Sequence, residues 1–149
     1  MIKFEGSVAD ELKNYIKKKE YKRTAVIAVI LFAVLSSIVI TVSLLTDLIG
    51  LTGLALTTAF LIFMLLPQKG IEKRLPTAIT IDGEAISLKS ESDDVSKELS
   101  QVKRVLNKEK WYEFEFYSPH KNIYFVCQKN LLAEGTLEEF EKLFQEKMI

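Results

Sequence analysis

The sequence has little of the chemistry that marks a metal site, a disulfide-bonded fold or a nucleic-acid surface. Its 149 residues include one cysteine and one histidine, which excludes a disulfide framework and a Cys/His zinc cluster within one chain. Lys+Arg and Asp+Glu number 20 each, so the formal net charge is zero. Nucleic-acid binders normally carry a basic excess, so we expect no nucleic-acid partner. The length is that of one domain, or of one small domain with an appendage.

Charged residues are also missing from one long stretch of the chain. Residues 24–68, 45 in number, contain a single charge, Asp47, whereas the other 104 residues hold 39 of the 40 charged side chains. Such segregation is typical of a membrane protein.

Two apolar runs within this stretch each predict a membrane-spanning helix. Residues 24–46 carry no charge, and at about 1.5 Å per residue they extend roughly 34 Å, more than the hydrocarbon core of about 30 Å. Residues 48–67 form a second run that ends at Pro67, a helix-stopping residue. Asp47 and Gly50 favour a turn between the runs. The sequence therefore predicts a transmembrane helical hairpin over residues 24–67, with Asp47 at its tip, outside the hydrocarbon.

The basic residues on either side of the hairpin predict its orientation, because the turn between the two runs contains none. By the positive-inside bias we expect a multi-pass protein of the cytoplasmic (inner) membrane of a bacterium, with both termini in the cytoplasm. The flanking basic residues are Lys13, Lys17, Lys18, Lys19, Lys22 and Arg23 before the first run, and Lys69, Lys73 and Arg74 after the second.

Two interpretations of these basic residues stay open. One is binding to anionic lipid head groups, worth roughly 1 kcal/mol per charge near the membrane surface. The other, which is the commoner cause of such a cluster, is a plain topology signal. The candidates for lipid contact are Lys17, Lys18, Lys19, Lys22, Arg23, Lys73 and Arg74.

The amino-terminal segment, residues 1–23, is basic and has a helical pattern. Ser7, followed by Asp10 three residues later, predicts a helix N-cap. Apolar residues at helical spacing then predict one buried face of a helix that continues into the first span. These residues are Val8, Leu12, Tyr15 and Ile16. Residues 1–4 instead fit a short strand added to the domain that follows the hairpin.

Small and hydroxyl-bearing residues in the two spans are candidates for helix packing. Ser37 and Thr41 are four apart in the first span, and Gly53 and Thr57 are four apart in the second. Folding the hairpin at its tip brings the two pairs to similar depths, where small residues permit close approach. A polar path or an oligomer contact is the functional alternative. Packing within the hairpin is favoured because no ionisable residue lies at mid-depth.

Residues 75–149 have the pattern of a small cytoplasmic domain of antiparallel strands. Alternating runs flank Asp82-Gly83, a strong hairpin signal, and we expect Ile79, Ile81, Ile86 and Leu88 to share the buried face. Residues 90–94 read as a loop, residues 95–99 as a helical turn or a weak strand, and residues 102–106 as a strand.

The second half of this domain is richer in aromatic residues. Residues 111–117 alternate, which predicts a strand with Tyr112, Phe114 and Phe116 inward and with Glu113 and Glu115 facing solvent. Residues 118–122 are expected to turn, and residues 123–128 to pair back, with Ile123, Phe125 and Cys127 on one face. Thr136 and Glu139 form a capping box that opens a helix over residues 137–148. Its predicted apolar stripe is Leu137, Phe140, Leu143, Phe144 and Met148.

In the order of these elements, the chain resembles the YcxB-like family of bacterial membrane proteins. The resemblance rests on Lys3-Phe4-Glu5-Gly6, the tandem spans, the stretch ITIDGEAISLKS and the ending VCQKNLLAEGTLEEFEKLF. It implies two adjacent spans and a cytoplasmic domain of pleckstrin-homology-like fold, with no established catalytic residues. The chain departs from the family where Leu99-Ser100-Gln101-Val102 lacks the tryptophan that family members often carry.

No motif in the sequence indicates catalysis, a metal or a cofactor. His120 lies in a predicted turn and Cys127 on a predicted inner face, where a buried structural thiol is the default. Trp111 and Tyr117 flank the aromatic strand and are candidates for a partner surface, although aromatic packing at strand ends is equally common.

The fold class expected is thus a membrane α-helical hairpin joined to a small, mostly antiparallel α+β domain with a carboxy-terminal helix. The function expected is that of a non-catalytic, membrane-anchored interaction module for a protein or lipid partner. An accessory subunit of a larger membrane complex, recognised through its spans, is the alternative. A membrane enzyme is the third hypothesis, and it requires polar residues that converge at a cleft. Oligomerisation is left open.

Overall fold

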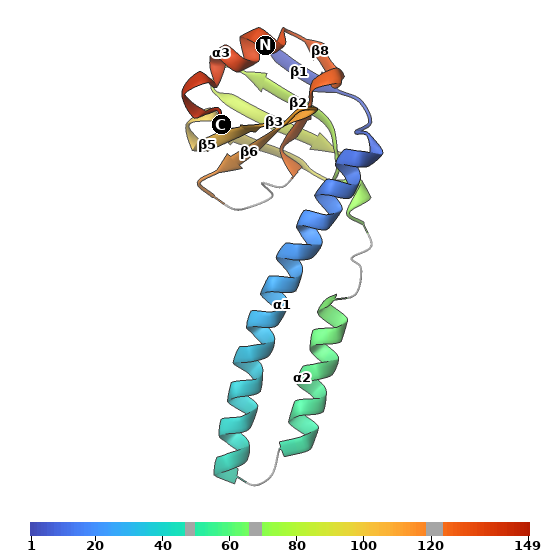
Figure 1. Ribbon diagram of the computed structural model, residues 1–149, viewed down its shortest axis with the longest axis vertical. Helices are drawn as coiled ribbons and strands as arrows, with labels where there is room; N and C mark the ends of the chain where they lie inside the picture. The colour runs from blue at the N-terminus through green and yellow to red at the C-terminus, as the bar shows by residue number, and fades with distance from the viewer. Residues whose placement is uncertain (47–49, 66–69, 119–123) are drawn as a thin grey trace. The chain divides into compact units, whose positions relative to one another are not determined.

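A computed structural model of the protein describes residues 1–46, 50–65, 70–118 and 124–149 (Figure 1). The chain divides into a β unit, Met1–Ile16 with Lys69–Ile149, and a helical unit, Lys17–Gln68. Five sequence-based assignments lie outside the described residues: Asp47 at a hairpin tip, Pro67 at a helix end, Lys69 among the flanking basic residues, His120 in a turn and Ile123 on a strand face.

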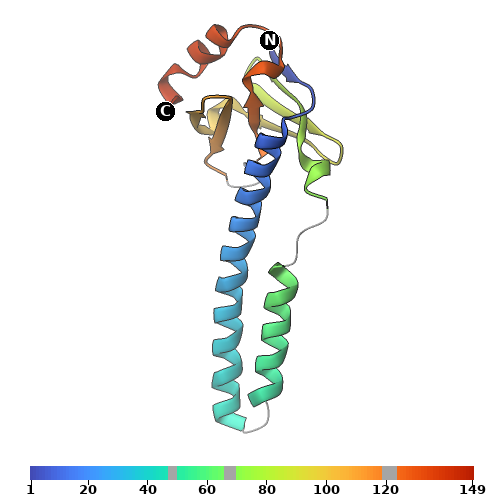
Figure 2. The same cartoon turned by 45° about the vertical axis from the view of Figure 1, so that its right-hand side comes forward.

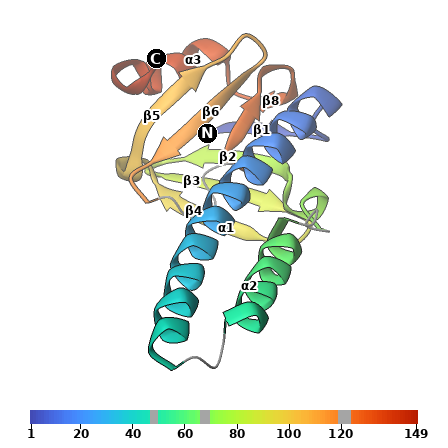
Figure 3. The same cartoon turned by 60° about the horizontal axis from the view of Figure 1, so that its bottom comes forward.

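Two antiparallel sheets make up the β unit (Figures 1 and 3). Among the described residues, one sheet has five strands in the order β4-β3-β2-β1-β8, and the other has three in the order β5-β6-β7. The strands are β1 (Ile2–Glu5), β2 (Pro76–Asp82), β3 (Ala85–Ser90), β4 (Asp94–Glu98), β5 (Val102–Asn107), β6 (Trp111–Phe116), β7 (Val126–Gln128) and β8 (Leu132–Glu134).

Strand β1 lies inside the five-stranded sheet, although it comes from the opposite end of the chain to its neighbours. It pairs with β2 from Ile2 opposite Ile81 to Glu5 opposite Ala78, and it pairs with β8 on its other side. The short strand expected at residues 1–4 is therefore confirmed. The segment 1–23, expected to stand apart from a domain at 75–149, instead contributes residues 1–16 to the β unit. The reason is that Ile2 and Phe4 are buried in the common core.

The hairpin of β2 and β3 agrees with the sequence pattern in its buried face but not in its turn. Ile79, Ile81, Ile86 and Leu88 are all buried, as expected. Asp82 pairs with Ala85, so the turn is Gly83-Glu84 and begins one residue later than expected. Gly83 has φ +55°, a left-handed conformation that favours glycine, and this places the glycine inside the two-residue turn.

The segment that follows β3 forms an edge strand and then crosses to the second sheet. Of residues 95–99, for which a helical turn and a weak strand were both open, residues 95–98 belong to β4, which lies along the outside of β3 and already includes Asp94, expected in a loop. A 3-10 turn at Leu99–Gln101 then leads into β5, which pairs with β6.

Strand β6 buries more of its side chains than its alternation predicts. Tyr112, Phe114 and Phe116 are buried, as expected. The expectation that Glu113 faces solvent is wrong, because its side chain is 1% exposed. Its carboxylate accepts a hydrogen bond from Tyr15, on the first turns of helix α1 (Asp10–Thr46), which cover this face of the sheet. Glu115 is partly exposed and pairs with Arg104 at 2.6 Å.

The carboxy-terminal helix is shorter than expected. Its capping box is confirmed, because Thr136 accepts a hydrogen bond from the Glu139 backbone and the Glu139 side chain accepts one from the Thr136 backbone. Helix α3 (Leu137–Leu143) ends five residues before the expected residue 148. Leu143 is 49% exposed, which contradicts its place in the apolar stripe.

Backbone pairing of the chain end explains the early termination of α3. Met148 forms a parallel bridge with Val105 of β5. The Ile149 amide donates to the Val105 carbonyl, and the Asn107 amide donates to the Ile149 carbonyl, both at 2.9 Å. These bonds require an extended backbone at Met148 and Ile149, which a helix that continues to residue 148 cannot supply. The chain reaches this position through a 3-10 turn over Gln145–Lys147.

Aromatic rings centred on Phe140 fill the space between α3 and the sheets. The ring of Phe140 lies 4.4 Å from that of Tyr112, 5.0 Å from Phe144 and 5.6 Å from Phe4, measured between centroids. Large rings bury the most apolar area per residue, so this cluster connects β1, β6 and α3 in one core.

The helical unit contains the rest of α1 and helix α2 (Gly50–Leu65), which runs antiparallel beside it (Figures 1 and 2). Among the described residues, α1 is the one helix long and apolar enough to cross a membrane. The 16 residues of α2 extend about 24 Å, short of a hydrocarbon core of about 30 Å. One candidate span is thus found, and a second span over residues 48–67 stays a prediction.

The capping box leads to a prediction about the free energy of unfolding of the protein. Thr136→Ala removes the side-chain acceptor at the start of α3 and is expected to lower the free energy of unfolding by about 1 kcal/mol. Chemical denaturation of the full-length protein in detergent, followed by Trp111 fluorescence, measures the change. Thr136→Ser keeps the hydroxyl and should unfold like the wild type, whereas equal losses in both variants would show that the cap contributes nothing.

Candidate functional site

Large apolar side chains are exposed over most of the surface of α2 and of the part of α1 that carries no charge. Leu44, Leu56 and Phe63 are among the most exposed side chains of the helical unit. Each such side chain, if left in water, forgoes roughly 1.5–3 kcal/mol of burial free energy. A core helix of a soluble protein buries these residues instead, so the surface fits contact with hydrocarbon. Further exposed residues are Val26, Ile27, Val29, Ile30, Val34, Ile38, Ile40, Phe60 and Ile62.

A narrow strip of small residues is buried within the helical unit. Gly53 and Thr57 of α2 and Ala28 of α1 are buried, and the hydroxyl oxygens of Ser36 and Ser43 are shielded from solvent.

Ser37 and Thr41, expected at the same helix contact, are exposed. The Thr41 hydroxyl donates to the Ser37 carbonyl of its own helix at 2.8 Å. Because successive residues lie about 100° apart on a helix, Ser36 points into the unit while its neighbour Ser37 points out.

The basic residues of α1 surround the helix just before its apolar part. Lys18, Lys22 and Arg23 are exposed, and Lys17 and Lys19 are half-buried. At about 100° per residue these five positions cover most of the helix circumference. Charged heads on long apolar stems can then reach the membrane interface on several sides of the helix.

Lys73 and Arg74 belong to the other unit, in the 3-10 helix η1 (Glu72–Arg74), where both are exposed. The loop between β3 and β4 fixes this helix, since the Ser92 amide and hydroxyl both donate to the Lys73 carbonyl at 3.0 Å. Glu91 lies 3.7 Å from the Lys73 ammonium and partly offsets its charge. Arg74 is the better candidate of the two for an anionic group.

The first two turns of α1 are built into the β unit. Leu12 and Ile16 are fully buried in its core. The Ala9 amide, just before the helix, donates to the side-chain oxygen of Gln128 at 2.8 Å. The N-cap expected at Ser7 is therefore wrong: α1 begins at Asp10, and the side-chain oxygen of Gln128 on β7 accepts the hydrogen bond from the backbone N–H there.

A polar contact under this helix joins it to β6. The Tyr15 hydroxyl donates to Glu113 at 2.7 Å, and the Tyr15 ring lies 5.3 Å from that of Trp111. Burial, together with the negative charge of Glu115, raises the pKa of Tyr15, so its hydroxyl stays protonated and can donate near neutral pH.

The two aromatic residues proposed as a partner surface differ in exposure. Trp111 packs against the core and against Tyr15, and its indole nitrogen is shielded from solvent. Tyr117 is 72% exposed. Trp111 therefore does not form an exposed pair with Tyr117, and Tyr117 alone remains available to a partner.

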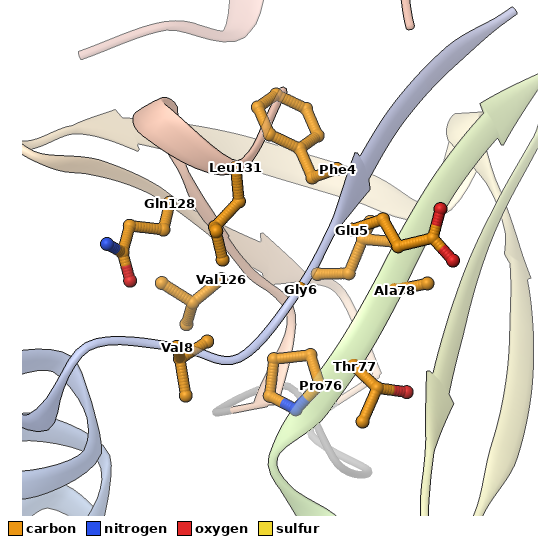
Figure 4. Close-up of a pocket in the computed structure, with 11 residues that line it drawn as sticks. Phe4, Glu5, Gly6, Val8, Pro76, Thr77, Ala78, Val126, Gln128 and Leu131 are labelled. Atoms are coloured by element: carbon orange, nitrogen blue, oxygen red, sulfur yellow. The ribbon is translucent and has the colours of Figure 1, made fainter. Parts of the chain in front are cut away.

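A small cleft lies between β1, β2 and β7 of the β unit (Figure 4). Phe4, Val8, Pro76 and Leu131 give it a mostly apolar lining, and its volume is about 10 Å³. That is the space of a single water molecule, far below the several hundred Å³ of a small-molecule site. The cleft therefore fits a packing gap rather than a substrate site.

Reactive groups do not converge in the part of the chain that the structure describes. No cluster of His, Cys, Asp and Glu there could hold a metal ion. Cys127 is buried, and burial raises the pKa of its thiol well above the usual value. Because the thiolate is the nucleophile, this thiol is held in its unreactive form.

The Tyr15–Glu113 contact makes a second stability prediction. Tyr15→Phe removes a donor to a buried carboxylate and is expected to lower the free energy of unfolding by about 1–3 kcal/mol. Denaturant titration of the full-length protein in detergent measures it. Tyr21→Phe, at an exposed tyrosine of the same helix, is the matched control and should leave stability unchanged. Equal effects of the two substitutions would contradict the role assigned to the contact.

Comparison with known proteins identified no relative of this chain. No family model matches the chain, and no curated protein or solved structure was found to be similar to it. The function of the chain therefore has to be argued from its own residues.

Proposed function

We propose that the protein is a non-catalytic, membrane-anchored interaction module, in which α1 tethers the β unit to the cytoplasmic face of the inner membrane. One observation carries the proposal. The first two turns of α1 belong to the buried core of the β unit, and the same uninterrupted helix then exposes apolar side chains from Val26 to Leu44. A helix of this kind anchors a folded unit to a bilayer without a linker.

The strand pairing supports the second span over residues 48–67. Strand β1 precedes the helical unit and β2 follows it, yet the two strands pair in one sheet. If α1 crosses the bilayer, the chain has to cross back before β2 for this sheet to form. The apolar residues of α2 and its flanks are the segment available for that return. With basic residues on both sides of the hairpin, this favours two spans and two cytoplasmic termini.

The arrangement of the β unit supports a pleckstrin-homology-like domain of the YcxB-like kind. Two antiparallel sheets enclose a core that a helix closes near the carboxyl end. Domains of this size commonly bind partners through surfaces rather than deep pockets, and the one-water cleft fits such a role. We therefore assign the unit a protein or lipid partner and no substrate.

The topology is tested by cysteine accessibility in intact cells. Tyr117→Cys places a thiol on the exposed surface of the β unit, and Asp47→Cys places one between the two proposed spans. A membrane-impermeant maleimide should label Asp47→Cys from outside, and Tyr117→Cys only after lysis. The wild type, whose one thiol is buried, is the unlabelled control. Labelling of Tyr117→Cys from outside, or extraction of the protein from membranes by alkaline carbonate, contradicts the proposal.

Lipid contact by the basic residues of α1 is tested in nanodiscs. Replacing Lys18, Lys22 and Arg23 by glutamine should weaken the preference for spin-labelled phosphatidylglycerol over phosphatidylcholine, at roughly 1 kcal/mol per charge. The matched control replaces Lys103, Lys108 and Lys142, which are exposed or half-buried in the β unit. If both triple variants keep the wild-type preference, the basic residues act as a topology signal alone.

A further inference from the structure

The four sheet edges of the β unit differ in whether they can accept another strand. The chain end covers β5, because Met148 and Ile149 pair with its outer side. Strands β7 and β8 have only three residues each, and β8 meets β1 with a shift in register. Strand β4 is longer, keeps a regular register with β3 along all five residues, and ends its sheet (Figure 3). It is the edge best able to template a partner strand.

The alternation of hydrogen bonds between β3 and β4 shows which backbone groups of β4 point away from the sheet. The Leu99 amide donates to Glu84, and the Ser90 amide donates to Asp93, at the two ends of the β3–β4 ladder. Bonded pairs alternate along an antiparallel ladder, so Val95 and Lys97 bond to β3. The amides and carbonyls of Asp94, Ser96 and Glu98 therefore face away from the sheet.

The charged residues along the β4 edge indicate which kind of strand can pair with it. Asp94, Ser96 and Glu98 are exposed on the outer face, and the hydroxyl of Ser100 donates to Glu98. A second copy would pair about Ser96 and place Asp94 of one chain opposite Glu98 of the other, which like-charge repulsion disfavours. On the inner face, the Lys97 ammonium lies 4.2 Å from the centroid of the Phe116 ring. A charged side chain that points inward at a sheet edge disfavours pairing of that edge with a fully apolar strand.

The pairing already present in the sheet shows what complements this edge from its inner side. On β3, Lys89 is opposite Asp94, Leu88 is opposite Val95, and Ser87 is opposite Ser96. The hydroxyl oxygens of Ser87 and Ser96 lie 3.0 Å apart. A strand added on the outer side repeats this pattern if it places a basic residue opposite Asp94 and a small hydroxyl residue opposite Ser96. Opposite Glu98, where β3 has Ala85, a second basic residue complements the carboxylate by charge.

We propose that the β4 edge binds an extended basic segment of a partner protein by strand addition, with Lys or Arg opposite both Asp94 and Glu98. The inference rests on the proposed function as an interaction module and names the partner class of that module. Main-chain hydrogen bonds at Asp94, Ser96 and Glu98 provide affinity, and the two carboxylates provide selectivity.

The test uses the full-length protein in nanodiscs and the synthetic peptide acetyl-GKTSVKGY-amide as the probe. In an NMR titration the amide signals of Asp94, Ser96 and Glu98 should shift most, because these amides gain a partner, whereas those of Val95 and Lys97 already bond to β3. Asp94→Lys with Glu98→Lys should weaken binding by about tenfold or more, as expected for the loss of two cross-strand charge pairs. Asp82→Lys with Glu109→Lys, the same charge change at exposed positions off this edge, should not.

Further variants separate backbone pairing from charge attraction. Ser96→Pro removes one outward amide and no backbone hydrogen bond to β3, although it also removes the side-chain bond from Ser87, and it should abolish binding. Ser96→Ala removes that side-chain bond alone and should keep binding. The peptide acetyl-GETSVEGY-amide should not bind.

Equal binding of the acidic peptide, or peptide-induced shifts confined to other strands, overturns the inference. Shifts at β4 that follow protein concentration without peptide also overturn it, in favour of a second copy. A protein that is not membrane-integral overturns the proposed function, whereas an integral protein whose β4 does not respond overturns only this inference.

Discussion

The burial of Leu12 and Ile16 is the constraint on which the other features depend. These two side chains make the start of α1 part of the β unit, and the same helix continues without a break into the apolar segment. The face of β6 beneath α1 buries Glu113, which Tyr15 satisfies. The burial of the carboxylate and the continuity of the β unit with the apolar helix thus both depend on one packing contact.

The elements with a strong period could be predicted from the sequence, because a single physical preference determines them. The absence of charge over residues 24–46 indicates the apolar part of α1 by itself. The alternation around Gly83 predicts both the β2–β3 hairpin and its four buried residues. The capping box at Thr136 likewise identifies the start of α3, since it depends on two side chains three residues apart.

The features that could not be predicted depend on contacts between distant parts of the chain. Glu113 alternates with aromatic residues like any solvated residue, but in the structure a hydrogen bond from Tyr15, 98 positions away, stabilises its buried carboxylate. The helical stripe of α3 continues to Met148 in sequence, but pairing with β5 extends the chain end. Ser36 and Ser37 are adjacent and chemically identical, so composition cannot say which one faces the neighbouring helix. The candidate edge at β4 likewise becomes evident only when the strand order is known.

The central position of β1 determines when the β unit can assemble. Strand β1 is synthesised before its partners β2 and β8, which lie more than 70 and more than 120 residues later in the chain. Loops of that length must close before the pairing contributes any stability, and such non-local contacts form slowly. Both apolar helices lie between β1 and β2, so they are synthesised before the sheet can be completed. Until then β1 is an unpaired strand with the exposed apolar side chains of Ile2 and Phe4, which makes it prone to aggregation during synthesis.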